Sequence, residues 1–450
     1  MSTPLASEPH MPPRLGLIDN VARRILVGRL AELQRGEITL EDATGSQQLG
    51  HAGDLHPTIC VNDRRFFRQA VLGGTLSVAE TYLRGDWDCD NLTDLFRLFI
   101  RNMDAATRLE GGIAKVTGMA HRLFHWWRDN TRSGSRRNIS AHYDLGNEFF
   151  KLWLDDTLAY SSGIFLTPES TLRDASIEKI DRACRKLDLK PHDQLVEIGT
   201  GWGGLAVHAA QNYRCHVTTT TISQEQHEIS RRRIDEHQLA DRVTLLQQDY
   251  RDLTGQFDKL VSIEMIEAVG HRHFDTYFRK CSSLLKPDGS LVIQAIVSPE
   301  RGYAEYLRNV DFIQRYIFPG GCLPSMAAML ESVGRTTDLR LVHAEDFAPH
   351  YAETLRRWRA AFNERLHEVR QQGYSEEFIR LWTYYLCYCE AVFEERHIGV
   401  YQIQFDKPLC HRDPIRLSER AAATQHKSHA TRHATSAGSD PAGRRRGVHS

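Results

Sequence analysis

The stretch Gln194–Leu205 restricts the folds open to this chain more than any other. It reads Gln-Leu-Val-Glu-Ile-Gly-Thr-Gly-Trp-Gly-Gly-Leu. The apolar residues before the glycines predict a short buried strand, and the residues after them have helical periodicity. The turn between strand and helix contains four glycines, Gly199, Gly201, Gly203 and Gly204. Backbone can approach a ligand closely at such a turn, so the stretch indicates a nucleotide or nucleoside site, although a tight turn without a ligand would also use glycines.

The glycine spacing alone does not select the ligand. Gly199-x-Gly201-x-x-Gly204 also satisfies the dinucleotide fingerprint, which normally has an Asp or Glu at the end of the next strand. The corresponding residues, 215–223, include no carboxylate. Glu197 stands ahead of the glycines instead, and the pattern E-x-G-x-G-x-G resembles the first motif of S-adenosylmethionine-dependent methyltransferases. We therefore expect a methyltransferase core.

The sequence after this turn alternates between helical and strand patterns. Further strands are predicted at 215–220, 242–247, 258–263 and 290–296, and helices at 204–211, 223–237 and 271–284. This alternation indicates an α/β fold with a doubly wound, mostly parallel sheet and ligands at the carboxyl ends of the strands. Beyond it we expect a β-turn at 286–289, a stiff loop at 316–324, a strand at 339–344, long helices at 351–371 and 375–395, and a last strand at 397–405.

The N-terminal sequence predicts a smaller, mixed α+β domain. Its expected elements are a helix at 17–33, strands at 36–42 and 57–62, and short helices at 64–71, 78–83 and 92–100. We expect five segments along the chain. They are a flexible lead (1–15), this lipid-associated N-terminal domain (16–130), a basic linker (131–141), a catalytic domain with helical acyl-pocket elements (142–410) and a disordered basic tail (411–450). The tail contains eight Lys and Arg against three Asp and Glu.

The composition of the chain indicates its cellular compartment and the classes of molecule that it can bind. The nine cysteines are dispersed without zinc-type spacing, so we expect reduced thiols, no metal site and a cytoplasmic setting. The formal net charge of -1 gives no general basic surface for nucleic acid. The first residues do not form a signal peptide, and no apolar stretch is long enough to span a bilayer. Membrane contact is therefore expected to be peripheral, on the inner face. Trp126 and Trp127 beside Arg128 suit such an interface, or pack between domains.

Eight short motifs follow one another between residues 142 and 405. They are HYDLGN from His142, YS from Tyr160, EIGTGWG from Glu197, TISQEQ from Thr221, QDYR from Gln248, EAVG from Glu267, YIFPG from Tyr316 and YYLCYC from Tyr384. In this order they resemble the cyclopropane-fatty-acyl-phospholipid synthases and their mycolic acid relatives. The resemblance implies a Rossmann-like class I methyltransferase fold. It also implies methyl transfer from S-adenosylmethionine to a cis double bond of a phospholipid acyl chain in a bilayer, followed by proton loss and closure of a cyclopropane ring.

The resemblance also implies which residues bind the cofactor. The glycines face its methionine part, a threonine and a glutamine bond the ribose in place of the missing carboxylate, and an aspartate and a tyrosine contact the adenine. The implied residues are Tyr160, Ser161, Glu197, Gly199, Gly201, Gly203, Thr221, Ile222, Gln226, Asp249 and Tyr250.

In the family a bound bicarbonate removes the proton. Glu267, Tyr351 and the backbone of Ile296 match residues that hold this ion. Ser162 stands where the family has a cysteine, and Gln294 where it has a histidine. Both side chains can bond an oxyanion, but the charge of the imidazole is lost, which weakens anion binding.

These departures leave the product open. Either bicarbonate binds differently, or the carbocation is resolved as a methyl-branched or methylene product. Glu267 could also be only a cap at a strand-to-helix junction. Cys389 aligns with a family cysteine considered catalytic, but its apolar helix favours a buried thiol. The sequence is also compatible with a small-molecule amine methyltransferase, with an inactive lipid-binding protein, and with a homodimer.

Overall fold

We describe residues 16–103 and 146–411 of the computed structural model. The predictions for residues 1–15, for Trp126 and Trp127, for the linker at 131–141 and for the tail beyond 411 lie outside these ranges. The described residues up to Pro408 belong to one compact unit. The division of that unit into an N-terminal and a catalytic domain stays a prediction.

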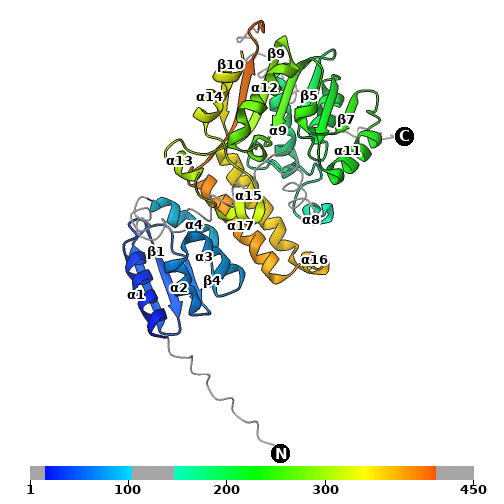
Figure 1. Ribbon diagram of the computed structural model, residues 1–450. Coiled ribbons are helices and arrows are strands. Elements are labelled where there is room, and N and C mark those ends of the chain that lie inside the picture. Colours follow the sequence, from blue (N-terminus) through cyan, green and yellow to red (C-terminus); the bar gives the residue numbers. More distant parts are fainter. Residues whose placement is uncertain (1–15, 104–145, 412–450) are drawn as a thin grey trace, which may run out of the picture. The chain divides into compact units, whose positions relative to one another are not determined.

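The first part of the chain builds a four-stranded sheet with helices, as expected for a mixed α+β region (Figure 1). The sheet order is β2-β1-β3-β4. Alternate residues of β1, such as Ile38 and Leu40, are buried, which gives the sheet one apolar face. The elements are α1 (Leu17–Ala31), β1 (Gly36–Asp42), β2 (Gly45–His51), β3 (Thr58–Val61), α2 (Arg65–Leu72), α3 (Gly74–Leu83), β4 (Trp87–Cys89) and α4 (Leu92–Arg101).

The second sheet has seven strands in the order β10-β11-β9-β8-β5-β6-β7. The five strands from β9 to β7 in this order pair in parallel, and β11 runs antiparallel to both β9 and β10. A doubly wound, mostly parallel sheet is thereby confirmed. The strands are β5 (Gln194–Ile198), β6 (His216–Thr221), β7 (Val243–Gln247), β8 (Phe257–Ile263), β9 (Leu285–Val297), β10 (Arg340–Asp346) and β11 (Gly399–Asp406).

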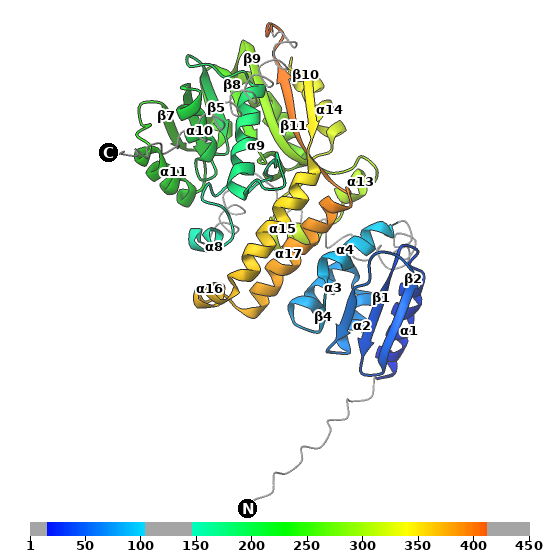
Figure 2. The same cartoon turned by 180° about the vertical axis from the view of Figure 1, so that it is seen from behind.

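Helices cover both faces of this sheet, which Figures 1 and 2 show from opposite sides. α9 (Leu172–Lys186), α10 (Gly204–Asn212) and α11 (Gln224–Glu236) share one apolar cluster with Leu195 of β5. α12 (Phe274–Leu284) and α14 (Met326–Thr336) share the other with the next residue, Val196. Successive residues of β5 thus enter opposite cores, which explains its continuous apolar sequence.

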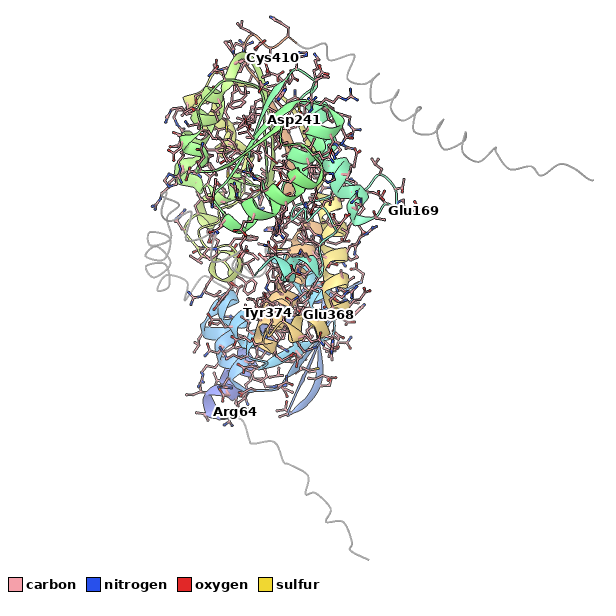
Figure 3. The ribbon with its side chains drawn as sticks, turned by 90° about the vertical axis from the view of Figure 1, so that its right-hand side faces the viewer. Arg64, Glu169, Asp241, Glu368, Tyr374 and Cys410 are labelled. Atoms are coloured by element: carbon pink, nitrogen blue, oxygen red, sulfur yellow. The ribbon has the colours of Figure 1, made fainter. Side chains whose placement is uncertain are left out.

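A helical layer with many aromatic side chains packs beside the sheet. It consists of α8 (Asn147–Lys151), α15 (Ala348–Glu364), α16 (Leu366–Gln371) and α17 (Glu376–Glu394). Trp153 lies with its ring centroid 5.6 Å from Trp358 and 5.5 Å from Trp382. Tyr374, which follows α16 and is labelled in Figure 3, stacks on Phe378 with 4.3 Å between the ring centroids. These rings fix the two long helices relative to each other.

Arg380 of α17 connects this layer to the N-terminal part. Its guanidinium donates to the backbone carbonyls of Tyr82 at 2.5 Å and Trp87 at 2.7 Å, and to the Asp88 carboxylate at 2.7 Å. α4 also packs along α17. The contacts place the N-terminal sheet on the helices that border the site described below.

Several segments differ from the sequence-based expectations. Residues 45–51 form β2, because pairing with β1 provides partners that the sequence does not reveal. Residues 286–289 were predicted to be a turn but lie inside β9. Phe257 of β8 pairs with Leu285 of β9, and the next pair is Lys259 with Ser290. Residues 286–289 of β9 therefore lie opposite a single residue of β8 and bulge out of the strand pairing. The loop expected at 316–324 begins inside a π-helix, η4 (Ile313–Ile317), and the helix expected at 351–371 breaks between α15 and α16.

Candidate active site

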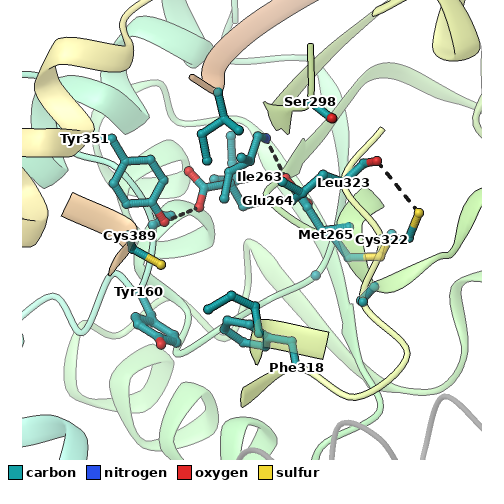
Figure 4. Close-up of a pocket in the computed structure, with 18 of the residues that line it drawn as sticks. Tyr160, Ile263, Glu264, Met265, Ser298, Phe318, Cys322, Leu323, Tyr351 and Cys389 are labelled. Atoms are coloured by element: carbon teal, nitrogen blue, oxygen red, sulfur yellow. Dashed lines mark hydrogen bonds between the residues drawn. The ribbon is translucent and has the colours of Figure 1, made fainter. Parts of the chain in front are cut away.

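A cavity of about 1430 Å³ opens at the carboxyl ends of β5, β6, β8 and β9. It exceeds the roughly 300–1,000 Å³ of ordinary small-molecule pockets. One end is the glycine turn after β5. The other end is apolar and aromatic, lined by Phe318, Leu355, Tyr385, Val392 and Phe393. The cavity therefore joins a polar cradle to an apolar chamber. Figure 4 shows part of the cavity lining, with Tyr160, Phe318 and Tyr351 labelled.

The glycine turn needs glycine for its backbone. Gly199, Gly201 and Gly203 have φ angles of 98°, 53° and 86°. Side chains rarely adopt these values, and a Cβ on Gly203 would lie 3.2 Å from the Cβ of Ser230. Gly199 and Gly201 line the cavity, whereas Gly203 is the N-cap of α10. The backbone thus forms an open cradle at the start of a helix.

The residues predicted for the ribose and the adenine line the same cavity. Thr221 Oγ1 donates to Gln226 Oε1 at 2.8 Å, which fixes both side chains at the end of β6. The Asp249 carboxylate accepts from the backbone N–H and the Nε of Arg251 at 2.9 and 2.8 Å, at the start of η1 (Tyr250–Asp252). Ile222 and Tyr250 complete this wall. Together with the glycine cradle, these groups fit S-adenosylmethionine.

The remaining predicted cofactor residues also line the cavity. The Tyr160 and Tyr385 hydroxyl oxygens lie 2.8 Å apart. Glu197 accepts from Thr219 Oγ1 at 2.6 Å, and burial raises the pKa of Glu197 to about 8. Ser161 Oγ accepts from the Lys179 ammonium at 2.7 Å.

Lys179 was not predicted from the sequence, although it too lines the cavity and is buried. Burial lowers its pKa, and the nearby carboxylates of Glu264, Asp155 and Glu197 act in the opposite direction. Its spacing of four residues from both Ala175 and Ala183 places Lys179 on the buried face of α9.

A second unpredicted residue, Glu264, occupies the wall between the cradle and the apolar chamber. Its Oε1 accepts from the Ser162 backbone N–H at 3.0 Å and from Gln294 Nε2 at 2.6 Å. Its Oε2 accepts from the Tyr351 hydroxyl at 3.0 Å, as Figure 4 shows. Burial raises the pKa of Glu264, whereas these hydrogen bonds and the Lys179 charge act to lower it.

Glu267 lies in a short 3-10 turn, η2 (Ile266–Ala268), on the same wall. Its Oε1 accepts from the Ile296 backbone N–H at 2.6 Å, and its Oε2 is enclosed without a hydrogen-bond partner. Burial, and then the charge of Glu264, raise the pKa of Glu267 to about 8. Two carboxyl groups with different partners thus face one chamber.

The groups predicted to hold bicarbonate already bond protein carboxylates. The backbone N–H of Ser162, the amide of Gln294 and the hydroxyl of Tyr351 all donate to Glu264, and the Ile296 N–H donates to Glu267. The Ser162 hydroxyl donates to the Gly163 carbonyl at 3.0 Å instead of to the cavity. These residues therefore do not fit a bound bicarbonate.

Cys389 lies on the cavity wall near Tyr351 (Figure 4), and burial raises the pKa of its thiol. Among residues 16–103 and 146–411, no cluster of three or more His, Cys, Asp or Glu is placed to bind a metal. Within the same ranges, no helix has the length and apolarity needed to cross a membrane.

A family model and individual relatives both match this sequence, and they indicate the same family. The sequence model of the family described as "Mycolic acid cyclopropane synthetase" matches residues 130–403. The tuberculostearic acid methyltransferase UfaA1 of Mycobacterium tuberculosis is 37% identical over 357 residues, covering 75% of this chain and 79% of that protein. The cyclopropane-fatty-acyl-phospholipid synthase of Escherichia coli K12 is 34% identical over 368 residues, covering 79% and 89%.

A solved structure agrees with these sequence matches. The mycolic acid cyclopropane synthase CmaA1, complexed with SAH and CTAB, superposes with a TM-score of 0.57 at 31% identity. The superposition covers 60% of this chain and 98% of that one.

Proposed function

The chain belongs to the mycolic acid cyclopropane synthetase family, and from this premise we propose that it methylates the cis double bond of unsaturated acyl chains in phospholipids and forms a cyclopropane ring. That it is a methyltransferase using S-adenosylmethionine follows from the family itself. The acyl substrate, its phospholipid form and the product are the proposed part.

One observation carries the proposal: the glycine cradle, the carboxyl groups and the apolar chamber all line a single cavity. A water-soluble amine would need only the polar end. An acyl chain uses the apolar end, where burial of each CH₂ group contributes roughly 0.8 kcal/mol. The volume allows the cofactor and part of a lipid chain to be present together.

The cofactor residues then have distinct roles. In the proposal Gly199 and Gly201 approach the methionine part with their backbone, Thr221 and Gln226 bond the ribose hydroxyls, and Asp249 contacts the adenine. Tyr160, Ser161, Glu197, Ile222 and Tyr250 complete the binding wall, and Gly203 shapes the turn. When bound, S-adenosylmethionine supplies a methyl group on a positively charged sulfur.

The chamber suits a substrate that passes through a carbocation. An alkene that donates its π electrons to a methyl group leaves a cation on the neighbouring carbon. The rings of Tyr160, Tyr351 and Tyr385 and the carboxyl groups of Glu264 and Glu267 surround the space where this charge develops. Ring faces and carboxylates stabilise a cation in a water-poor site, and the apolar walls keep water from trapping it.

A methylene or methyl-branched product is the second candidate, and one observation favours it. The groups expected to bind bicarbonate, the base that the resemblance implies for ring closure, bond Glu264 and Glu267 instead. A relative that shares 37% identity is named a tuberculostearic acid methyltransferase. The methylene product differs from the cyclopropane only in how the cation is resolved, whereas a saturated methyl-branched product also requires reduction of the methylene group by a hydride donor.

Contact with a bilayer is a further part of the proposal, at the cytoplasmic face that nine free thiols favour. α1 exposes four apolar side chains on its outer surface: Leu17, Ile18, Val21 and Ile25, which are 41% to 85% exposed. The exposed Arg24 lies on the same helix, and Arg64, labelled in Figure 3, is paired with Asp19 at 3.8 Å. Apolar and basic side chains together suit an anionic membrane surface.

The membrane contact is tested by flotation with phosphatidylglycerol vesicles. We expect the full chain to float with the vesicles and a Leu17→Asp, Val21→Asp double variant to remain at the bottom. Leu341→Asp, which changes an exposed apolar residue of β10, is the matched control and should still float. Equal flotation of all three proteins would rule out α1 as the contact surface.

The activity is tested with S-adenosylmethionine carrying a ¹³C-methyl group and vesicles of a cis-monounsaturated phospholipid. We expect ¹³C in the acyl chains, with cyclopropyl resonances in the NMR spectrum of the extracted lipid. Exocyclic methylene or methyl-branch resonances would instead establish the second candidate. Absence of label from the lipid, with label in a soluble amine, would refute the proposal.

A further inference from the structure

Glu264 has a backbone conformation that glutamate rarely adopts. It follows the last residue of β8, and its φ angle is 46°, in the left-handed region. The backbone N–H of Glu264 donates to the backbone carbonyl of Gln294 at 2.8 Å, which anchors the bend to the neighbouring strand β9. Such a conformation costs on the order of 1–2 kcal/mol for a residue with a side chain. Strain of this kind is concentrated at sites where a side chain must be aimed precisely at a ligand or a reacting group.

The bend directs the carboxylate into a set of three donors. A backbone N–H, an amide N–H and a phenol O–H converge on it from Ser162, Gln294 and Tyr351. Burial raises the pKa of Glu264, and the three hydrogen bonds and the Lys179 charge oppose this by favouring the ionised form. The donors therefore prepare this side chain to carry a negative charge at the wall of the chamber.

The Gln294 amide is itself held in one orientation. Its Oε1 accepts from Gln402 Nε2 at 3.1 Å, and Gln402 Oε1 accepts from the Lys186 ammonium at 2.8 Å. With its oxygen fixed in this way, Gln294 presents its NH₂ group to Glu264. A histidine at this position would have supplied a charge. Here the charge comes from Lys179, which acts on Glu264 from the cavity wall.

We propose that Glu264 is the catalytic base of this enzyme, so that its carboxylate takes the place of bicarbonate and the reaction needs no external anion. The inference rests on the proposed methylation of an acyl double bond. It rests further on the geometry: the donors that would surround bicarbonate surround this side chain, and the side chain lines the chamber where the cation forms.

The proton balance is simple. The alkene carbon gains a bond to the methyl carbon through its π pair, and the methyl–sulfur bond breaks with its pair remaining on sulfur. Glu264 then takes one proton from the transferred methyl group, and the electron pair of that C–H bond closes the ring onto the cationic carbon. The proton ends on the Glu264 carboxylate, which becomes neutral, and no oxidant or reductant is required. Proton loss after a hydride shift gives the methylene product with the same base.

Glu267 is the less suitable base of the two. It receives one hydrogen bond, from the Ile296 N–H, and its other oxygen has no donor. The protonated form is favoured there by burial and by the neighbouring Glu264 charge. A neutral Glu267 leaves a single negative charge in the chamber, on the carboxylate that has three donors. Glu267 then contributes to the electrostatic field around the carbocation and does not accept the proton.

The test removes the carboxylate and offers it back from solution. Glu264→Gly suits the left-handed bend and leaves a hole lined by three donors. Glu264→Gln fills the same space without a charge and is the matched control. Wild type and both variants are assayed for transfer of ¹⁴C-methyl to cis-unsaturated phospholipid vesicles in buffer freed of carbon dioxide. Formate or bicarbonate is then added at millimolar concentration, and binding of S-adenosylhomocysteine is measured by calorimetry to show that each variant is folded.

The wild type is expected to be equally active with and without bicarbonate. Both variants should lose about 100-fold or more in rate, the range for removal of a general base. Formate or bicarbonate should restore Glu264→Gly by about tenfold or more and leave Glu264→Gln unchanged, since only the first has room for the ion. A wild type that needs added bicarbonate, a Glu264→Gln variant of near-normal rate, or a folded Glu264→Gly that no anion restores would each overturn the inference. Failure of the wild type to label lipid at all would refute the proposed function instead.

Discussion

The protonation of Glu267 connects the stability of this protein to pH, and one substitution isolates the effect. The unpartnered oxygen, burial and the nearby Glu264 charge raise the pKa of Glu267 from 4.5 to about 8. At neutral pH the folded protein therefore retains a proton that the unfolded chain has released. Stability from this group is complete below the unfolded pKa, and it is lost as the pH rises towards 8.

The magnitude follows from the number of protons released on unfolding. Between about pH 6 and about pH 7.5, folded Glu267 is mostly protonated and unfolded Glu267 is ionised, so the free energy of unfolding falls by about 1.4 kcal/mol per pH unit. The wild type should then lose up to about 2 kcal/mol over this interval relative to Glu267→Gln, which has no proton to release.

The measurement is urea unfolding of the full chain at the two pH values. Glu331→Gln is the matched control, because Glu331 is exposed on α14 and should leave the pH dependence of the wild type unchanged. The reasoning fails if Glu267→Gln loses as much stability as the wild type between the two pH values. That outcome would mean that Glu267 is already ionised in the folded protein.

Three further substitutions test other parts of the structure. Tyr351→Phe removes one donor from the Glu264 carboxylate, so methyl transfer should slow by about tenfold while the Kd for S-adenosylhomocysteine, measured by calorimetry, stays constant. Gly203→Ala should destabilise the fold by about 1–3 kcal/mol, because the φ angle of Gly203 is 86° and the new Cβ would lie too close to Ser230 of α11. Gly204→Ala is the control and should destabilise the fold less, because its new Cβ would make only ordinary contacts. Thermal unfolding compares the two variants. Arg380→Ala should cost about 2–4 kcal/mol, since it removes the hydrogen bonds that Arg380 donates to two carbonyls and a carboxylate of the N-terminal part, and unfolding in urea measures it.

The sequence could predict that the candidate cofactor residues lie together, because their signals are local. Gly199 and Gly201 stand within one strand–turn–helix unit, and Thr221 and Asp249 follow strands whose carboxyl ends meet at one edge of a parallel sheet. Once parallel strands were predicted, their carboxyl ends were expected to lie at the same edge of the sheet. Glu267 was expected from the resemblance to the family, and its position after a strand end agrees with the same reasoning.

Glu264 could not be recognised in this way. It also stands after β8, only three residues before Glu267, and nothing local distinguishes the two. Its donors come from distant parts of the chain: Ser162 is 102 residues away and Tyr351 is 87 residues away. Only the packing of α15 against the sheet brings them together. For the same reason the sequence offered a bicarbonate site at Ser162 and Gln294, whose donors the folded chain uses internally.

The bend at Glu264 has an evolutionary consequence. Glycine adopts a φ angle of 46° without strain, so this backbone accepts either a glutamate or a glycine. Codons for these two amino acids differ by one base in the second position. A single point mutation could therefore exchange a tethered anion for a diffusible one, and lineages could gain or lose dependence on dissolved carbon dioxide without rebuilding the scaffold.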